Sequence, residues 1–223
     1  MKIFSIRIWL AFFLVTVMAT DAVGIDGSPF VSYSDETDGN LKVARCSSAN
    51  CVSATTYVVD GSLNSVGYNS SIGIGPDGFP VIAYSDITAN TLKMARCSAL
   101  LPTFPPTPTC SSASTVAVGS PIGANYAHIS LSFGNDGLPI IAWYRSTDRT
   151  PRFAKCRDAA CVSSAIDTVD PTTFTPGQGV SVTTGADGMP VWAYLDQTSS
   201  GGIFYLREVR CINPFCKNNG VRR

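Results

Sequence analysis

Short apolar stretches alternate with polar turns along the chain, in the period-two pattern that is typical of β-strands. Residues 71–74 (SIGI) alternate, an Asp-Gly turn follows, and residues 80–84 (PVIAY) are apolar on both faces. After a polar turn, residues 91–96 (TLKMAR) alternate again and end at a cysteine. Since Asp-Gly favours tight hairpin turns, this order predicts a meander of short strands, and its second strand should be covered on both sides.

The same phrase occurs four times. Each copy contains Gly-x-Asp-Gly, an apolar run that ends in an aromatic residue, and a strand that ends in Cys. The turns stand at Asp26-Gly27, Asp77-Gly78, Asp136-Gly137 and Asp187-Gly188, spaced 51, 59 and 51 residues apart. A fixed period of this size indicates stacked supersecondary units. We expect one domain over residues 23–216, with repeats at about 23–60, 69–118, 128–170 and 179–216 and a tail at 217–223.

Four-stranded units of this length predict an all-β fold, a β-propeller-like array of about four repeats that form a complete or an incomplete ring. A linear β-solenoid or a β-sandwich is the alternative, but solenoid coils are usually shorter and a sandwich does not explain four similar phrases. In the first copy the first strand should overlap residues 22–25. The last copy should lack its fourth strand. The insertion 100–109 (LLPTFPPTPT) should form an extended surface excursion.

Eight cysteines fall into four local pairs, one in each repeat. The pairs are Cys46 and Cys51, Cys97 and Cys110, Cys156 and Cys161, and Cys211 and Cys216. An even number of cysteines, paired within repeats, predicts a disulfide framework, whereas zinc sites need closer spacing and more ligands. We therefore expect four disulfides, no metal site and no cofactor.

Residues 1–22 have the features of a secretory signal peptide: basic residues at the start, then the apolar run 8–19 (IWLAFFLVTVMA). This run is shorter than the roughly 20 residues that a bilayer span needs. Small residues before Ala19 and before Ala22 offer two cleavage sites. We expect a secreted, extracellular or cell-surface protein. An uncleaved N-terminal anchor is the alternative.

The repeat resembles those of secreted, mostly bacterial propeller-like proteins, which contain Gly-x-Asp-Gly-x-Pro-x-Ile-x-Tyr-x-Asp followed by Leu-Lys-x-Ala-x-Cys. Residues 71–97 match this phrase most closely. It is more distantly similar to NHL-type and sialidase-like blades, although the sialidase Asp-box is absent. The resemblance implies a propeller fold, and it implies no particular activity because these families include both binding scaffolds and glycosidases.

The end of the second strand in each repeat is the candidate ligand-binding place. An aromatic residue stands there in every copy, and an acidic residue follows two positions later in three of them. The pairs are Tyr33 and Asp35, Tyr84 and Asp86, Trp143 and Arg145, and Tyr194 and Asp196. A ring of these groups would suit a sugar or a peptide. Alternatively, the aromatic residues pack between blades and the acids hold the turns, which their recurrence favours.

No residue set for catalysis is evident. His128 is the single histidine, nucleophile motifs are absent, and Asp35–Asn40 is only a fragment of a calcium loop. With 16 basic and 16 acidic residues, the chain lacks the charge that would favour nucleic acid. We expect a non-catalytic recognition or scaffold module with an unknown extracellular protein or glycan ligand, and self-association would complete the propeller. A lectin and a sialidase-like glycoside hydrolase are the alternatives.

Overall fold

The computed structural model describes residues 19–103, 106–119, 128–145, 148, 150–168, 176–197, 204–216 and 220–222. The regular elements within these ranges are β-strands, and none of the described residues belongs to a helix that could cross a membrane. Most of the predicted signal peptide lies outside the described residues. The all-β class that the composition and the alternation predicted is confirmed.

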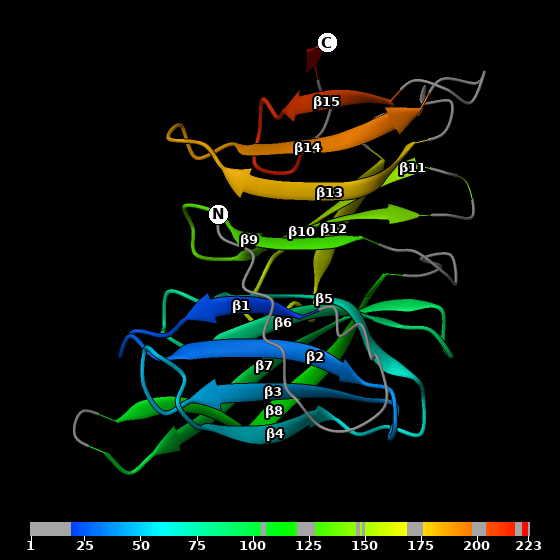
Figure 1. Cartoon of the computed structure of the whole chain (residues 1–223). Coiled ribbons are helices and arrows are strands. Elements are labelled where there is room, and N and C mark those ends of the chain that lie inside the picture. Colours follow the sequence, from blue (N-terminus) through cyan, green and yellow to red (C-terminus); the bar gives the residue numbers. More distant parts are fainter. Residues whose placement is uncertain are drawn as a thin grey trace.

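The strands form four antiparallel sheets, and the strands of each sheet follow one another in chain order (Figure 1). The first sheet holds β1 (Thr20–Val23), β2 (Pro29–Asp35), β3 (Asn40–Cys46) and β4 (Ala54–Asp60). The second holds β5 (Val66–Ile74), β6 (Pro80–Asp86), β7 (Thr91–Leu101) and β8 (Thr107–Gly119). The third holds β9 (Ile129–Phe133), β10 (Pro139–Arg145), β11 (Thr150–Cys156) and β12 (Ser164–Thr168). The fourth holds β13 (Pro176–Thr184), β14 (Pro190–Gln197), β15 (Phe204–Arg210) and β16 (Gly220–Arg222).

These sheets are the blades of a four-bladed β-propeller, as predicted. The first strands of successive blades lie against one another, β1 on β5, β5 on β9 and β9 on β13. Three apolar clusters fill the junctions between the first and second, second and third, and third and fourth blades. Each of the two middle blades thus contributes one face to the core it shares with the blade before it and the other face to the core it shares with the blade after it, whereas the first and fourth blades contribute one face each.

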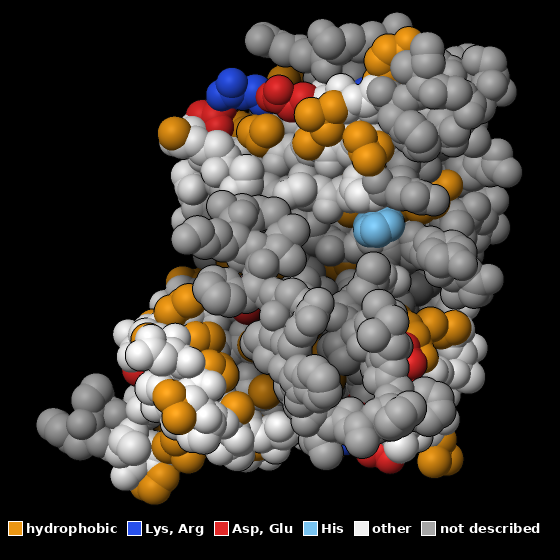
Figure 2. Space-filling model, in the orientation of Figure 1, with side chains coloured by type: hydrophobic (Ala, Val, Ile, Leu, Met, Phe, Trp, Pro, Cys, Tyr) orange, Lys and Arg blue, Asp and Glu red, His pale blue; other side chains and the backbone are white. Residues whose placement is uncertain are grey.

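Burial along the second strand of each blade depends on the place of the blade in the series. Every residue of β6 is buried, and β10 is buried over Pro139–Trp143. In β2 and β14, buried positions alternate with more exposed ones. Hydrophobic side chains accordingly reach the surface over β14 and β15 of the fourth blade (Figure 2). The predicted covering on both faces is therefore confirmed for the two middle blades and holds on one face only for the first and fourth.

The turn between the first two strands of each blade explains the repeated phrase. Asp77 Oδ1 accepts a hydrogen bond from the Phe79 backbone nitrogen at 3.2 Å, and the carboxylate forms an ion pair with Arg96 in β7. A Cβ on Gly75 would lie 2.9 Å from that same Oδ1 atom, and Gly78 has a φ of 84°. Equivalent ion pairs join Asp26 to Arg45, Asp136 to Lys155 and Asp187 to Arg210. The phrase therefore encodes a turn and the basic residue that binds it.

All four predicted disulfides are present, one in each blade, and no cysteine is free. The second cysteine of each short loop, Cys51, Cys161 and Cys216, has a left-handed backbone with φ between 48° and 56°. Its nitrogen donates to the carbonyl three residues earlier, as in the 2.9 Å bond from Cys51 to Ser48. Each of these loops is therefore a tight turn that a disulfide closes after the third strand of its blade.

Three expectations about the ends and the insertion differ from the structure. The insertion is largely a continuation of the β7–β8 hairpin, since Ala99, Leu100 and Leu101 pair with Thr109, Pro108 and Thr107. The last blade does have a fourth strand, because Gly220–Arg222 in the predicted tail pairs with β15. The first strand of the first blade begins at Thr20, two residues earlier than predicted. In each case backbone pairing with an adjacent strand extends the sheet beyond the residues with a recognisable side-chain pattern.

Replacing Gly137 by Ala should destabilise the protein more than replacing Gly27 by Ala. Their φ values, 74° and 76°, impose a similar cost of about 1 kcal/mol on alanine. A Cβ on Gly137 would also lie 2.7 Å from Cγ of Pro76 in the preceding blade, whereas nothing lies within 4 Å of a Cβ on Gly27. We expect a further loss of about 1–3 kcal/mol for Gly137→Ala, measured by urea unfolding. Equal losses for the two variants would contradict this contact.

Cleavage of the predicted signal peptide should occur after Ala19 and not after Ala22. The Thr20 hydroxyl donates to the Ser70 carbonyl of the second blade and bonds to Ser32 Oγ, both at 3.0 Å. Cleavage after Ala22 would remove every residue of β1 except Val23. The intact mass of the exported protein checks this prediction, and a mature chain that begins at Val23 would contradict it.

Candidate functional site

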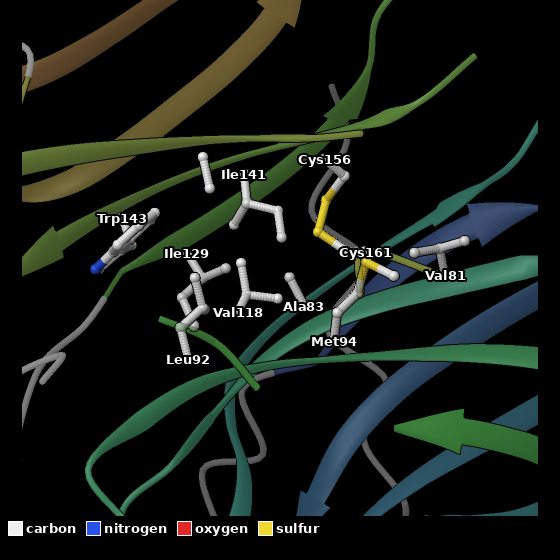
Figure 3. Close-up of a cluster of buried hydrophobic side chains, with 11 residues drawn as sticks. Val81, Ala83, Leu92, Met94, Val118, Ile129, Ile141, Trp143, Cys156 and Cys161 are labelled. Atoms are coloured by element: carbon white, nitrogen blue, oxygen red, sulfur yellow. A yellow bond between two sulfur atoms is a disulfide. The ribbon is translucent and has the colours of Figure 1, made fainter. Parts of the chain in front are cut away.

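Three of the four predicted aromatic residues lie between blades and not in an open ring. Tyr84, Trp143 and Tyr194 are 0%, 3% and 2% exposed. Trp143 is part of the apolar cluster between the second and third blades, together with Ile141 and the side chains of Val81 and Met94 (Figure 3). Tyr33, in the first blade, is partly exposed. Three of the four predicted aromatic side chains are therefore inaccessible to a ligand.

A buried polar cluster joins the first two blades at this end of the strands. The Tyr84 hydroxyl donates to Asp60 Oδ2 at 2.6 Å, and Lys93 forms an ion pair with the same carboxylate. Lys93 Nζ is also 3.8 Å from Asp86 Oδ2, which accepts a hydrogen bond from the Asn64 side chain at 2.8 Å. Since Asp60 ends the first blade, the cluster ties the last strand of one blade to the next blade.

The charge states of Asp60 and Tyr84 are fixed at neutral pH. Burial raises the pKa of Asp60, but the hydrogen bonds from Lys93 and Tyr84 outweigh burial and hold it below 3.8. Burial and the Asp60 carboxylate raise the pKa of Tyr84 far above its usual value. Asp60 is therefore an anion and Tyr84 a neutral donor. Neither group is poised to exchange a proton near neutral pH, as a general acid or base would be.

The other acidic candidates are paired with basic residues of the third strand in their blade. Asp35 pairs with Lys42, which also lies 3.1 Å from Asp38. Asp196 is 3% exposed and pairs with Arg207 at 2.5 Å. These ion pairs agree with the alternative in which the acids hold the turns and do not contact a ligand.

Arg145, which departs from the repeat, shares the carboxylate of Asp148 with Arg152. Asp148 stands in the turn that follows and accepts hydrogen bonds from Arg145 Nε and Arg152 Nη2, both at 2.8 Å. The Arg145 hydrogen bond is the main reason that the pKa of Asp148 lies well below its usual value. The third blade therefore keeps an ion pair at this place, but its acid, Asp148, lies in the turn and both adjoining strands supply a base.

No described residues form a group that could hold a metal ion. Among them, no three His, Cys, Asp or Glu side chains come together in a suitable way. The segment 35–40 is a polar turn, in which the Thr37 nitrogen donates to Asp35 Oδ1 at 3.0 Å and the Gly39 nitrogen to the Asp35 carbonyl at 2.8 Å. Burial lowers the pKa of His128, which is therefore neutral at pH 7.

Sequence reasoning missed two hollows at the opposite end of the blades, between the Gly-x-Asp-Gly turns. The first has a volume of about 420 Å³ and lies between the turns of the second and third blades. The second has a volume of about 250 Å³ and lies between those of the third and fourth. Asn135 lines both, with Pro76 and Phe133 in the first and Met189 and Pro214 in the second. The sequence does contain a signal for these hollows: the residue after the first glycine of the Gly-x-Asp-Gly turn differs in each copy.

No protein-family profile and no curated protein sequence matches this chain significantly. Its fold is similar to that of solved structures. An α-L-arabinanase of Penicillium chrysogenum, complexed with arabinobiose, has a TM-score of 0.60 at 13% identity and matches 93% of this chain and 66% of its own. An exo-β-1,3-galactanase of Phanerochaete chrysosporium has a TM-score of 0.52 at 9% identity over 92% and 49% of the two chains. An engineered GH43 glycoside hydrolase gives 0.50 at 14% over 86% and 37%.

These similarities establish the propeller fold alone, because all three identities are 14% or lower. The present chain spans about two thirds of the arabinanase and smaller parts of the other two. Neighbours of glycoside-hydrolase type are consistent with the propeller that the repeat resemblance implied.

Replacing Tyr84 by Phe should cost about 1.5–3 kcal/mol of stability, because it removes a buried hydrogen bond to a charged group. Tyr33→Phe is the matched control, and we expect a change below about 0.5 kcal/mol at this partly exposed position. The folded pKa of Asp60 is depressed, so its contribution is present above pH 3.8 and is lost as the pH falls. Urea unfolding of both variants at neutral and acidic pH checks this. The difference between them should shrink in acid.

Proposed function

We propose that this protein is a non-catalytic recognition module that acts outside the cell. The observation that carries the proposal is the pairing of the acidic candidates at the ends of the second strands. Asp35, Asp86 and Asp196 each lie in an ion pair with a basic residue of the neighbouring strand. Such acids stabilise turns and junctions, and they are not arranged as a reactive set. The four disulfides fit an oxidising, extracellular environment.

Glycoside hydrolysis, the enzymatic alternative, needs two carboxylic acids on either side of the scissile bond. On the described parts of the first strands of the blades, which lie nearest one another, Asp21 is the single acidic residue. The polar residues there are mostly hydroxyl-bearing instead, among them Thr20, Ser71, Ser130 and Ser181. The chain is therefore similar to glycosidases in fold, but the described parts of these strands carry no pair of carboxylates.

The surface that suits recognition is the end of the blades that carries the two hollows. Its framework residues, the turn aspartates and glycines, recur in every blade, while the residues between them differ. An amide from Asn135, the Phe133 ring and the Met189 side chain provide both polar and apolar contacts. Such a mixture suits a glycan or a peptide ligand. The lectin alternative would use this end of the blades and not the buried aromatic positions.

A glycan array and a peptide array, each probed with the disulfide-bonded protein, test this proposal. We expect binding without turnover, and we expect Asn135→Ala to weaken it at least about tenfold, as loss of a well-placed hydrogen bond does. Asn50→Ala, an exposed amide in a disulfide loop, is the control and should change nothing. Hydrolysis of any member of a chromogenic glycoside panel would overturn the non-catalytic assignment. Binding that both variants retain would overturn the assigned surface.

A further inference from the structure

In the part of the chain that the structure describes, the first and fourth blades each keep one face that no other blade covers. On the first blade this face, here called the leading face, consists of Val31, Tyr33, Lys42 and Ala44. On the fourth blade the corresponding trailing face consists of Val191, Ala193, Leu195, Leu206 and Glu208. Leu206 is 74% exposed and Leu195 36%. Large apolar groups on an otherwise regular sheet face indicate an interaction surface.

The strand register shows that these faces are the two halves of the junction that joins blades elsewhere in the chain. The leading face has the same register positions as Ile82, Tyr84, Lys93 and Ala95. The trailing face has the same positions as Val81, Ala83, Ser85, Leu92 and Met94. In the second blade both sets are covered, the first by the first blade and the second by the third blade.

Contacts at the turns show independently that the first blade has no blade before it. A Cβ on Gly78 would lie 3.2 Å from Ile25 of the preceding blade, and a Cβ on Gly188 would lie 2.6 Å from Asn135. At the equivalent Gly27, nothing lies within 4 Å. The turn of the fourth blade is therefore not seated on that of the first.

Hydrogen bonds between the first strands of the blades show that the fourth blade likewise has no blade after it. Ser71 Oγ accepts a hydrogen bond from the Leu131 nitrogen of the next blade at 3.0 Å, and Ser130 Oγ accepts one from Val182 at 3.0 Å. Ser181 stands at the equivalent position of the fourth blade and is exposed. Its hydroxyl is therefore available to the first strand of an incoming blade.

We propose that the trailing face of one copy packs on the leading face of a second copy, head to tail, and continues the series of blades across two chains. A second copy is the expected partner because the same two kinds of surface already pack together at three blade junctions within this chain. Such an interface uses two different patches, so it is heterologous, and it forms a ring where the rotation closes.

One residue of the trailing face departs from the pattern and limits the affinity. Glu208 occupies the position held by Val43, Met94 and Phe153 in the other blades, where the side chains are 0%, 1% and 0% exposed. Burying a carboxylate among apolar groups is costly. The association is therefore reversible, and Glu208→Met should tighten it at least about tenfold.

Sedimentation velocity over a dilution series tests the proposal, with one variant for each face. Leu206→Asp places a charge on the trailing face, and Tyr33→Asp places one on the leading face. Val162→Asp is the control, because Val162 is 76% exposed and belongs to neither face. We expect wild type and the control to associate as concentration rises, and each of the two face variants to remain monomeric. Unchanged urea midpoints would show that the variants fold.

Mixing the two face variants makes the test specific for head-to-tail contact. The Tyr33→Asp chain keeps an intact trailing face and the Leu206→Asp chain an intact leading face, so the mixture should form a one-to-one dimer and nothing larger. Monomeric wild type and Glu208→Met at every concentration would overturn the proposal, as would association that survives both substitutions or a mixture that does not dimerise.

Discussion

Face-to-face packing of consecutive sheets is the interaction on which the rest of the structure depends. A four-stranded meander with apolar residues on both faces of its second strand cannot cover those faces itself. In β6 and β10 the neighbours on both sides do so, and Ile82, Ala83, Ile141 and Ala142 are 0% exposed. The junction between the first and second blades also pairs buried polar groups across blades, since Asp60 of the first blade accepts from Tyr84 and Lys93 of the second. Packing of one blade on the next thus covers the apolar sheet faces and also pairs the buried charges.

The repeated phrase has a structural meaning at nearly every position. The aspartate binds the turn backbone and a basic residue across the sheet, and the two glycines provide room for the carboxylate and a left-handed backbone. Strong recurrence therefore identifies residues that build the blade. Recognition is better sought where the copies differ, such as at Asn135 and Pro76, or where the pattern breaks, as at Glu208.

The sequence allowed the fold to be predicted well, because strand alternation, Asp-Gly turns and local cysteine pairs all act within one repeat. The candidate site was harder to predict, because its surroundings come from the adjacent repeat. The partner of the Tyr84 hydroxyl is Asp60, 24 residues earlier in the preceding blade, and no repeated spacing marks it. The pairing of Arg145 with Asp148 and the hollows between turns likewise depend on how blades are placed. The continuation of β7 and β8 and the short β16 arise from backbone pairing, which leaves little trace in side-chain pattern.

The local character of the disulfides has a consequence for how such a chain matures. Three bridges join cysteines 5 residues apart and the fourth joins cysteines 13 residues apart, and each lies within a single meander. If the chain is exported as proposed and threads through a translocation pore, both thiols of a pair emerge almost together, before those of the next pair. Correct oxidation can then proceed in order from the N-terminus, with little demand for isomerase-catalysed shuffling.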